Sequence, residues 1–331
     1  MKALRVTGYG TLEDNLEFQN VPVPTINNDE VLIECISASI NPHDTKLIRG
    51  DFKRMEKLKF PYPIGGDVSG VIVKKGINVK NFEIGDEVFG VVQGAIAEYE
   101  SVNAAQVTKK PVNLSFYEAA SLPIAGMTTI QALQYASIKS GDKILIHAGS
   151  GGVGSFAIQY AKAKGAYVYT TTSADNCAWV KTLGADVVID YKKENYLDML
   201  SDLDIVYDTL GGQYTFDAFK IIRQGGRVVS ILPSEINKEV AKELGIPPFM
   251  QFVFSLRKSK IEELKKQKNA YYRYFFVNVR KKEDLNEIKE LAENRRIKPM
   301  IEKIYAFDDS KQAFKDLAKG HAKGKLVIKI K

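Results

Sequence analysis

The residues whose spacing best indicates a chemical role are three glycines, Gly149, Gly151 and Gly154, in the pattern G-x-G-x-x-G. They follow the apolar run 143–147 and precede the alanine-rich run 155–164. One glycine in such a turn tolerates unusual torsion angles, another lets the backbone approach a pyrophosphate, and a third lets the helix pack closely on the strand. The start of the helix offers amide N–H groups and a positive dipole end to phosphates. The turn is therefore predicted to bind a dinucleotide, with a purely structural turn as the alternative. The predicted contacts are Ala148, Gly149, Gly151, Gly152, Val153 and Gly154.

The end of the next predicted strand indicates which dinucleotide binds. NAD-binding proteins of this type usually place Asp or Glu there, where the acid holds the ribose 2′-hydroxyl. Here the strand ends in Thr172 and Ser173, which leave room for a 2′-phosphate and can donate hydrogen bonds to it. Asp175 would repel a phosphate, unless it caps the following helix, as Asp often does. We therefore expect NADPH, with NADH as the weaker alternative.

Alternating strands and helices must position this turn. Such alternation is typical of a doubly wound parallel sheet. Residues before about 115 instead form short β-branched runs separated by Gly, Asn and Asp, and residues after 280 return to that character. The prediction is an α/β protein in which a Rossmann domain, 125–279, is inserted in a mostly β domain, 1–124 and 280–331. Its strands are expected at 143–147, 166–171, 186–190, 204–208, 227–231 and 274–279.

Composition limits the function classes. The 331 residues are 45% apolar and 26% charged, as in an ordinary globular protein. There is no apolar run of about eighteen residues and no signal-peptide pattern, so no membrane partner is expected. Two separated cysteines, Cys35 and Cys177, suit a reducing compartment, and the cytoplasm is predicted. The net charge is +7, but the lysines of 260–266 alternate with acids as on a solvated helix face, so no nucleic-acid partner is expected.

With these features in view, the chain resembles the medium-chain dehydrogenase/reductase superfamily, and within it the zinc-independent quinone oxidoreductase and enone oxidoreductase branch that includes zeta-crystallin. The resemblance covers essentially the whole chain. It implies a GroES-like catalytic domain, a Rossmann cofactor domain, a cleft between them that holds the nicotinamide, and a homodimer. Its marks are Asn41-Pro42-His43-Asp44, Gly65-Gly66-Asp67-Val68-Ser69-Gly70, Gly85-Asp86-Glu87-Val88, Leu122-Pro123, Ala125-Gly126-Met127-Thr128-Thr129, the glycine turn, Leu183-Gly184-Ala185-Asp186, Asp208-Thr209-Leu210-Gly211-Gly212 and Gly320-His321-Ala322-Lys323-Gly324-Lys325.

The same resemblance argues against zinc. Zinc alcohol dehydrogenases of the superfamily carry Cys where this chain has Asn41 and His where it has Gly66. Neither residue supplies the thiolate or imidazole that zinc requires. After Gly90 the chain also lacks the cysteine-rich lobe that holds a structural zinc. No metal ligands are therefore predicted.

Three residues are predicted to act on the substrate or the nicotinamide. Asn41 is the first candidate to orient either one, although an Asn-Pro pair can simply shape a turn. Lys46 is expected to contribute charge or a proton, or else to be solvated. Thr128 matches a family position near the nicotinamide, or caps a helix. His43 is expected at the surface and His147 in packing.

Further cofactor contacts are predicted where sheet strands end, the edge at which doubly wound sheets bind ligands. Core packing is the alternative for Phe276 and Val277, and the family resemblance alone supports Lys325. The predicted residues are Tyr191, Leu210, Leu232, Phe276, Val277 and Lys325.

These features together predict an NADPH-dependent reductase that delivers hydride, without a metal, to quinones or α,β-unsaturated carbonyls such as enones and 2-alkenals. One alternative is a dinucleotide-binding sensor, scaffold or RNA-binding protein with little catalysis. The other, disfavoured by the missing ligands, is a zinc-type alcohol dehydrogenase.

Overall fold

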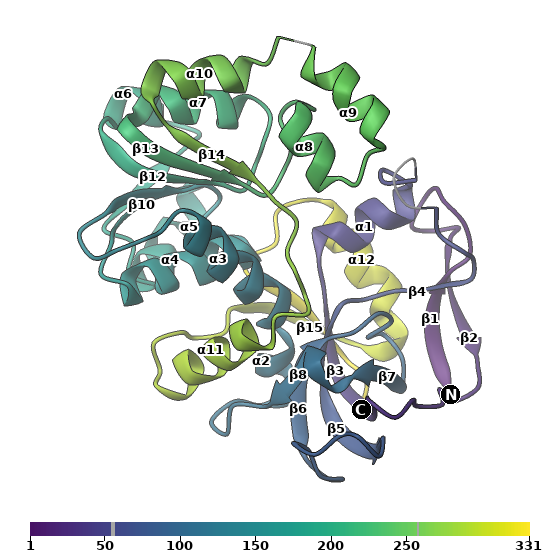
Figure 1. Cartoon of the computed structure of the whole chain (residues 1–331). Coiled ribbons are helices and arrows are strands. Elements are labelled where there is room, and N and C mark those ends of the chain that lie inside the picture. The colour runs from purple at the N-terminus through teal and green to yellow at the C-terminus, as the bar shows by residue number, and fades with distance from the viewer. Residues whose placement is uncertain (54–56, 257) are drawn as a thin grey trace. The chain divides into compact units, whose positions relative to one another are not determined.

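A computed structural model describes residues 1–53, 57–256 and 258–331 (Figure 1). The chain divides into two compact units. Unit 1 comprises Met1–Met127 and Asn278–Lys331, and unit 2 comprises Thr128–Val277. Helix α3 (Pro123–Tyr135) runs across the division.

Unit 2 is built on a six-stranded parallel sheet with the order β11-β10-β9-β12-β13-β14. The central strands are continuous apolar runs, and Ile144, Leu145 and Ile146 of β9 are completely buried. Burial on both faces explains why these strands do not alternate apolar with polar residues. The strands are β9 (Lys143–Ile146), β10 (Tyr167–Thr172), β11 (Val187–Asp190), β12 (Leu203–Asp208), β13 (Ile222–Ser230) and β14 (Tyr271–Tyr274).

The strand order reverses between β9 and β12. From β9 the chain builds outward through β10 and β11, and then returns to the other side of β9 to continue with β12. Doubly wound sheets bind ligands at such a switch point, outside the carboxyl ends of the strands. The glycine turn follows β9 and the loop at 209–212 follows β12, so both lie at this position. The helices of unit 2 after α3 are α4 (Gly152–Ala163), α5 (Ala174–Thr182), α6 (Tyr196–Met199), α7 (Gln213–Ile221), α8 (Lys238–Glu243), α9 (Pro248–Ser255) and α10 (Lys260–Lys268).

Unit 1 contains a seven-stranded sheet with the order β15-β16-β3-β5-β6-β8, in which β7 also pairs with β3, and a three-stranded sheet β2-β1-β4. The strands are β1 (Lys2–Val6), β2 (Leu16–Asn20), β3 (Glu30–Ile40), β4 (Tyr62–Pro63), β5 (Asp67–Lys75), β6 (Glu87–Val91), β7 (Tyr99–Asn103), β8 (Val107–Lys109), β15 (Ile301–Ala306) and β16 (Lys325–Lys329). The remaining helices are α1 (Pro42–Arg49), α2 (Phe116–Ala120), α11 (Lys282–Glu293) and α12 (Ser310–Ala318), with short 3-10 turns at Ala104–Gln106 and Phe307–Asp309.

The register of β3 brings three distant segments together in unit 1. The C-terminal strand β16 pairs antiparallel with β3, so that Leu326 lies opposite Ile40. On the other side of β3, Asp67 at the start of β5 lies opposite Ser39. The residues just beyond the end of β3 therefore meet both Asp67 and Lys325.

The predicted fold class, a Rossmann sheet together with a GroES-like mostly β domain, is confirmed. The prediction for the last strand of the parallel sheet is wrong, because it is Tyr271–Tyr274 and not 274–279 that pairs with β13. The aromatic run at 274–279 has the same β propensity, but the register of β13 ends at Ser230, which lies opposite Tyr274. Across the described ranges, no helix combines the length and the apolar character that crossing a membrane would require.

Candidate functional site

The three glycines of the turn are not all needed for the same physical reason. A Cβ atom on Gly154 would lie 2.2 Å from the Ala148 carbonyl oxygen and 2.8 Å from the Gly149 Cα atom. A Cβ atom on Gly149 would lie 2.2 Å from Thr170 Oγ1. These two glycines are therefore required by the close packing of strand and helix. A Cβ atom on Gly151 would have only the Ala148 oxygen within 4 Å, at 3.4 Å. Of the three glycines in the turn, Gly151 is therefore the one that the described chain leaves with open space.

The unusual torsion angle of the turn belongs to an alanine and not to a glycine. Ala148 has φ 51°, whereas Gly149, Gly151 and Gly154 are not among the residues with positive φ. A left-handed conformation costs a non-glycine residue roughly 1–2 kcal/mol. The Ala148 N–H donates to Thr171 Oγ1 at 3.3 Å, and the Ala148 carbonyl accepts from the Gly151 N–H at 3.0 Å. These bonds hold the strained residue in place.

Among the described residues, helix α4 begins without a side-chain cap. Its N-cap residue is Gly151, with φ −77° and ψ 172°, and it makes no side-chain cap hydrogen bond. The first N–H groups of any α-helix have no acceptor within the helix. The amides of Gly152, Val153 and Gly154 are therefore suited to an anion, and the helix dipole adds a favourable field for negative charge.

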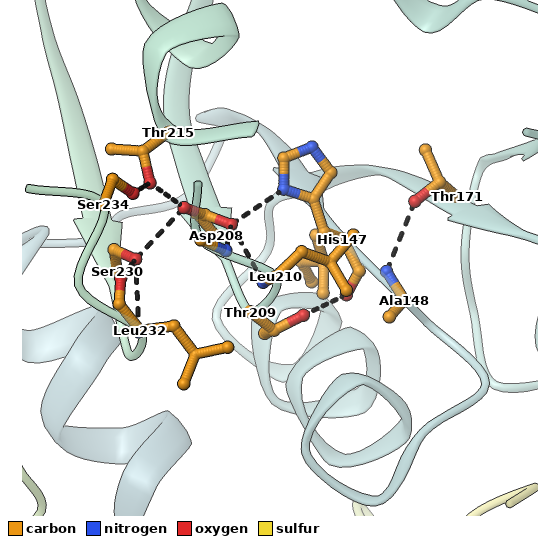
Figure 2. Close-up of polar contacts among 12 residues, drawn as sticks. His147, Ala148, Thr171, Asp208, Thr209, Leu210, Thr215, Ser230, Leu232 and Ser234 are labelled. Carbon is orange, nitrogen blue, oxygen red and sulfur yellow. Dashed lines mark hydrogen bonds and ion pairs between the residues drawn. The ribbon is translucent and has the colours of Figure 1, made fainter. Parts of the chain in front are cut away.

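Asp208 connects the loops that follow β12 and β13 (Figure 2). Its Oδ1 atom accepts from the backbone N–H groups of Leu210 and Gly211, each at 2.9 Å. Its Oδ2 atom accepts from the hydroxyls of Ser230, at 3.0 Å, and Thr215. Ser230 Oγ in turn accepts from the Leu232 N–H at 3.3 Å. One buried carboxylate thus fixes the positions of two predicted cofactor contacts, Leu210 and Leu232.

His147 is completely buried behind the turn, as expected for a packing residue. Its Nδ1 atom lies 3.4 Å from Asp208 Oδ1, and its ring contacts the rings of Tyr196 and Tyr214 at 5.4 and 5.3 Å between centroids. The Thr209 hydroxyl donates to the His147 carbonyl at 2.9 Å. Burial alone would raise the pKa of Asp208, but its contacts with His147, Thr215 and Gly211 outweigh burial and hold the pKa below its ordinary value.

The ends of β10 and β11 carry the residues predicted to distinguish the cofactors. Thr172 lies opposite Asp190, and its Oγ1 atom is buried without a hydrogen-bond partner in the described part of the chain. Asp190 Oδ1 accepts from the Lys192 N–H at 3.2 Å. Tyr191 and Lys192 are exposed just beyond β11. Ser173, and not Asp175, is the N-cap residue of α5, so the suggestion that Asp175 is the cap is wrong.

In unit 1, Asn41 lies in a buried polar cluster centred on Asp67. Asp67 Oδ2 accepts from Ser39 Oγ and from Asn41 Nδ2, both at 2.8 Å, and its Oδ1 accepts from the Ile124 N–H at 2.7 Å. Lys325 Nζ donates to Asp67 Oδ2 at 2.9 Å and to Asn41 Oδ1 at 2.5 Å. Asp67 is completely buried and the Lys325 side chain is 7% exposed, so this is an interior ion pair.

The helix that follows Asn41 presents the other residues of this loop. Asn41 is the N-cap residue of α1, and its backbone N–H donates to Asp44 Oδ2 at 2.8 Å. Burial raises the pKa of Asp44 to about 7. Lys46 is half-buried, and burial lowers its pKa. His43 is exposed and stacks on Phe52, with 5.0 Å between ring centroids.

The remaining predicted residues are dispersed. Thr128 is buried inside α3 and not at its start, so the helix-cap alternative is wrong. Leu210 and Phe276 are exposed, and Leu232 and Val277 are half-buried. All five belong to unit 2, whereas Lys325 belongs to unit 1.

For two residues at the centres of these networks, the sequence predicted no functional role. Asp67 and Asp208 both stand inside motifs that support the family resemblance. The sequence signal that could have found them is an acidic residue at the end of an apolar strand. A buried carboxylate must be hydrogen-bonded or paired, so an acid at such a position indicates polar partners. Their partners come from other strands and could not be read locally.

The two positions that would hold a catalytic zinc offer no suitable donors. The Asn41 amide oxygen is already bonded to the Lys325 ammonium group, and that positive charge would repel a metal cation. A Cβ atom on Gly66 would lie 2.6 Å from Ile124 Cδ1, so a larger side chain there would require the end of the Ile124 side chain to move. Within the described ranges, no group of three or more His, Cys, Asp or Glu residues is placed to hold a metal ion.

Two domain families match the chain. The alcohol dehydrogenase GroES-like domain matches residues 27–112, and the zinc-binding dehydrogenase domain matches residues 183–328. The second family name refers to zinc, although Asn41 and Gly66 supply no zinc donor.

Individual proteins match over nearly the full length. The chain is 36% identical to a 2-methylene-furan-3-one reductase of Solanum lycopersicum, over 99% of this chain and 79% of the relative. It is 33% identical to a chloroplastic NADPH-dependent alkenal/one oxidoreductase of Arabidopsis thaliana, over the same shares of the two chains. Among solved structures, the quinone oxidoreductase of Coxiella burnetii superposes with a TM-score of 0.85 at 32% identity, over 100% of this chain and 99% of that one. These matches, together with the fold and the glycine turn, show that the chain belongs to the medium-chain dehydrogenase/reductase family, in its zinc-independent quinone and enone oxidoreductase branch.

Proposed function

We propose that this protein uses NADPH to reduce the conjugated carbon–carbon double bond of quinones, enones or 2-alkenals, without a metal. The observation that carries the proposal is the space at Gly151, at the uncapped start of α4 and at the switch point of the parallel sheet. The pyrophosphate of a dinucleotide has the charge and the size that this position accepts.

The preference for NADPH rests on the end of β10. Thr172 and Ser173 stand there in place of the Asp or Glu that would hold a ribose 2′-hydroxyl and repel a 2′-phosphate. The exposed Lys192 and Lys193 add positive charge just beyond β11. The printed name of the Arabidopsis thaliana relative also specifies NADPH.

The substrate class follows from what the relatives' names have in common. A 2-methylene-furan-3-one, an alkenal or alkenone, and a quinone all contain a double bond conjugated to a carbonyl group. When bound, the reduced nicotinamide supplies a hydride, which is two electrons and one hydrogen. The hydride adds to the β-carbon, the π electrons move to the carbonyl oxygen, and a proton from water completes the product. The second Nδ2 hydrogen of Asn41 is suited to stabilise the negative charge that develops on that oxygen.

The test is a steady-state assay of NADPH oxidation with a panel of 2-alkenals, cyclic enones and benzoquinones. A parallel fluorescence titration measures the dissociation constants of NADPH and NADH. We expect saturable turnover with at least one conjugated carbonyl and tighter binding of NADPH than of NADH. Tight NADPH binding without turnover of any acceptor would overturn the enzymatic part and favour a sensor or scaffold.

The cytoplasmic location, the homodimer and the absence of a nucleic-acid partner stay predictions. Several relatives carry "chloroplastic" or "mitochondrial" in their names, so the location requires its own measurement. Mass photometry measures the oligomeric state directly.

A further inference from the structure

The buried cluster in unit 1 determines the orientation of the Asn41 side chain. Lysine carries only donors and an ionised carboxylate only acceptors. The Asn41 oxygen must therefore face Lys325 Nζ, at 2.5 Å, and its nitrogen must face Asp67 Oδ2, at 2.8 Å. If the amide were flipped, it would place donor against donor and acceptor against acceptor.

This arrangement leaves one N–H of Asn41 available. Asn41 Nδ2 carries two hydrogens and makes one hydrogen bond within the described chain, to Asp67. Asn41 is 6% exposed, so the second hydrogen lies in surroundings that are nearly shielded from water. A hydrogen bond is stronger in such low-dielectric surroundings than in water.

The ammonium group of Lys325 also polarises the amide. A positive charge at the carbonyl oxygen draws electron density from the nitrogen, which makes its N–H groups better donors. Asp67 holds Lys325 in place at 2.9 Å and balances its charge, while Ser39 and the Ile124 N–H hold Asp67. The cluster therefore has the parts of a preorganised single-donor site.

We infer that Lys325 is a positioning residue, which Asp67 fixes in place and which orients and polarises Asn41 so that its second N–H donates to the substrate carbonyl oxygen. The inference rests on the proposed function, because that oxygen gains negative charge only when hydride reaches a conjugated carbon. It assigns to Lys325 a role toward the substrate, in place of the direct cofactor contact that the sequence predicted.

A double-mutant cycle between Asn41→Ala and Lys325→Met tests the inference. Removing one such donor lowers kcat by about 100-fold, and losing the residue that orients it should cost about 10- to 100-fold. If Lys325 acts through Asn41, Lys325→Met should lower kcat by no more than about threefold in the Asn41→Ala background, because residues that act as a unit are not additive. The dissociation constant of NADPH should stay within about twofold of the wild-type value in each variant.

Two further variants separate this role from simple stability. Lys325→Met leaves Asp67 as an unpaired buried charge, so Lys325→Met combined with Asp67→Asn provides a neutral version that should fold and show the same low kcat. Lys110→Met is the matched control. Lys110 is also a buried lysine of unit 1, but its partners are the carbonyls of Pro111 and Leu114 and the Glu87 carboxylate, and not Asn41. It should lower the melting temperature and leave kcat unchanged.

Each outcome has one meaning. If the wild type turns over and the two losses multiply, the proposed function stands and the role of Lys325 is refuted. A neutral double variant with wild-type kcat refutes it as well. If the wild type reduces no acceptor at all, the proposed function fails and takes this inference with it.

Discussion

Replacing Gly151 by alanine should abolish tight cofactor binding while leaving the folded protein intact. The backbone at Gly151, with φ −77° and ψ 172°, is open to any L-amino acid, and the new Cβ atom would lie 3.4 Å from its nearest neighbour. Alanine restricts the unfolded chain, which stabilises by about 0.4–1 kcal/mol, but it is a poorer N-cap residue than glycine. We therefore expect the free energy of unfolding to change by less than about 1 kcal/mol.

Replacing Gly154 by alanine should, in contrast, lower the free energy of unfolding. Its Cβ atom would lie 2.2 Å from the Ala148 oxygen, more than an ångström inside ordinary contact distance. Its three nearest neighbours are all backbone atoms, which cannot rotate away. Overpacking of this kind costs typically about 1–3 kcal/mol, which lowers the melting temperature of a unit of this size by roughly 2–4 °C per kcal/mol.

The assay is thermal melting of both variants with and without NADPH, combined with fluorescence titration. NADPH at about 100 times its dissociation constant stabilises the wild type by about 2.7 kcal/mol. Free Gly151→Ala should melt like the wild type. With NADPH it should lose at least about half of this gain, because the methyl group occupies the place of the pyrophosphate. We expect its dissociation constant for NADPH to rise at least about 10-fold, or about 1.4 kcal/mol. An unchanged dissociation constant would refute the assignment of the pyrophosphate to this turn.

Three further predictions use other residues. Ser173→Asp keeps a good N-cap for α5 but adds a carboxylate at the end of β10, so titration should show NADPH binding weakened at least about 10-fold and NADH binding nearly unchanged. Asp208→Asn should lower the melting temperature near pH 7, and this deficit should shrink toward pH 3. The reason is that the pKa of Asp208 is lowered in the folded protein. Its charge therefore stabilises the fold above its unfolded pKa of about 3.9, and this stabilisation is lost as the pH falls through the folded pKa. Glu100→Gln should raise stability at pH 9 and not at pH 4, because burial raises the pKa of Glu100 to about 8 and its ionisation opposes folding as the pH rises toward that value. Urea unfolding across pH measures both pH effects, and a constant difference would contradict them.

The local pattern of the sequence was enough to predict the strand, the glycine turn and the helix at the centre of unit 2. Strand, glycine turn and helix are neighbours in the chain, so residues 143–164 reveal their structure through apolar runs and glycine spacing. The parallel sheet followed from the same alternation of strands and helices. The last strand was misplaced because 271–274 and 274–279 are both aromatic, and only pairing with β13 selects the first.

The sequence by itself therefore determined the fold class and the glycine turn, because each depends on residue types at short spacing. The replacement of zinc ligands by Asn41 and Gly66 is what the family resemblance implies. Only the tertiary structure showed that Gly151 is the glycine with open space and that Ala148 carries the strained torsion angle. It alone joined Lys325 to Asn41, which is 284 positions away in the chain. That contact depends on the pairing of Leu326 with Ile40 between β16 and β3, and strand register between distant segments leaves no local signal in the sequence.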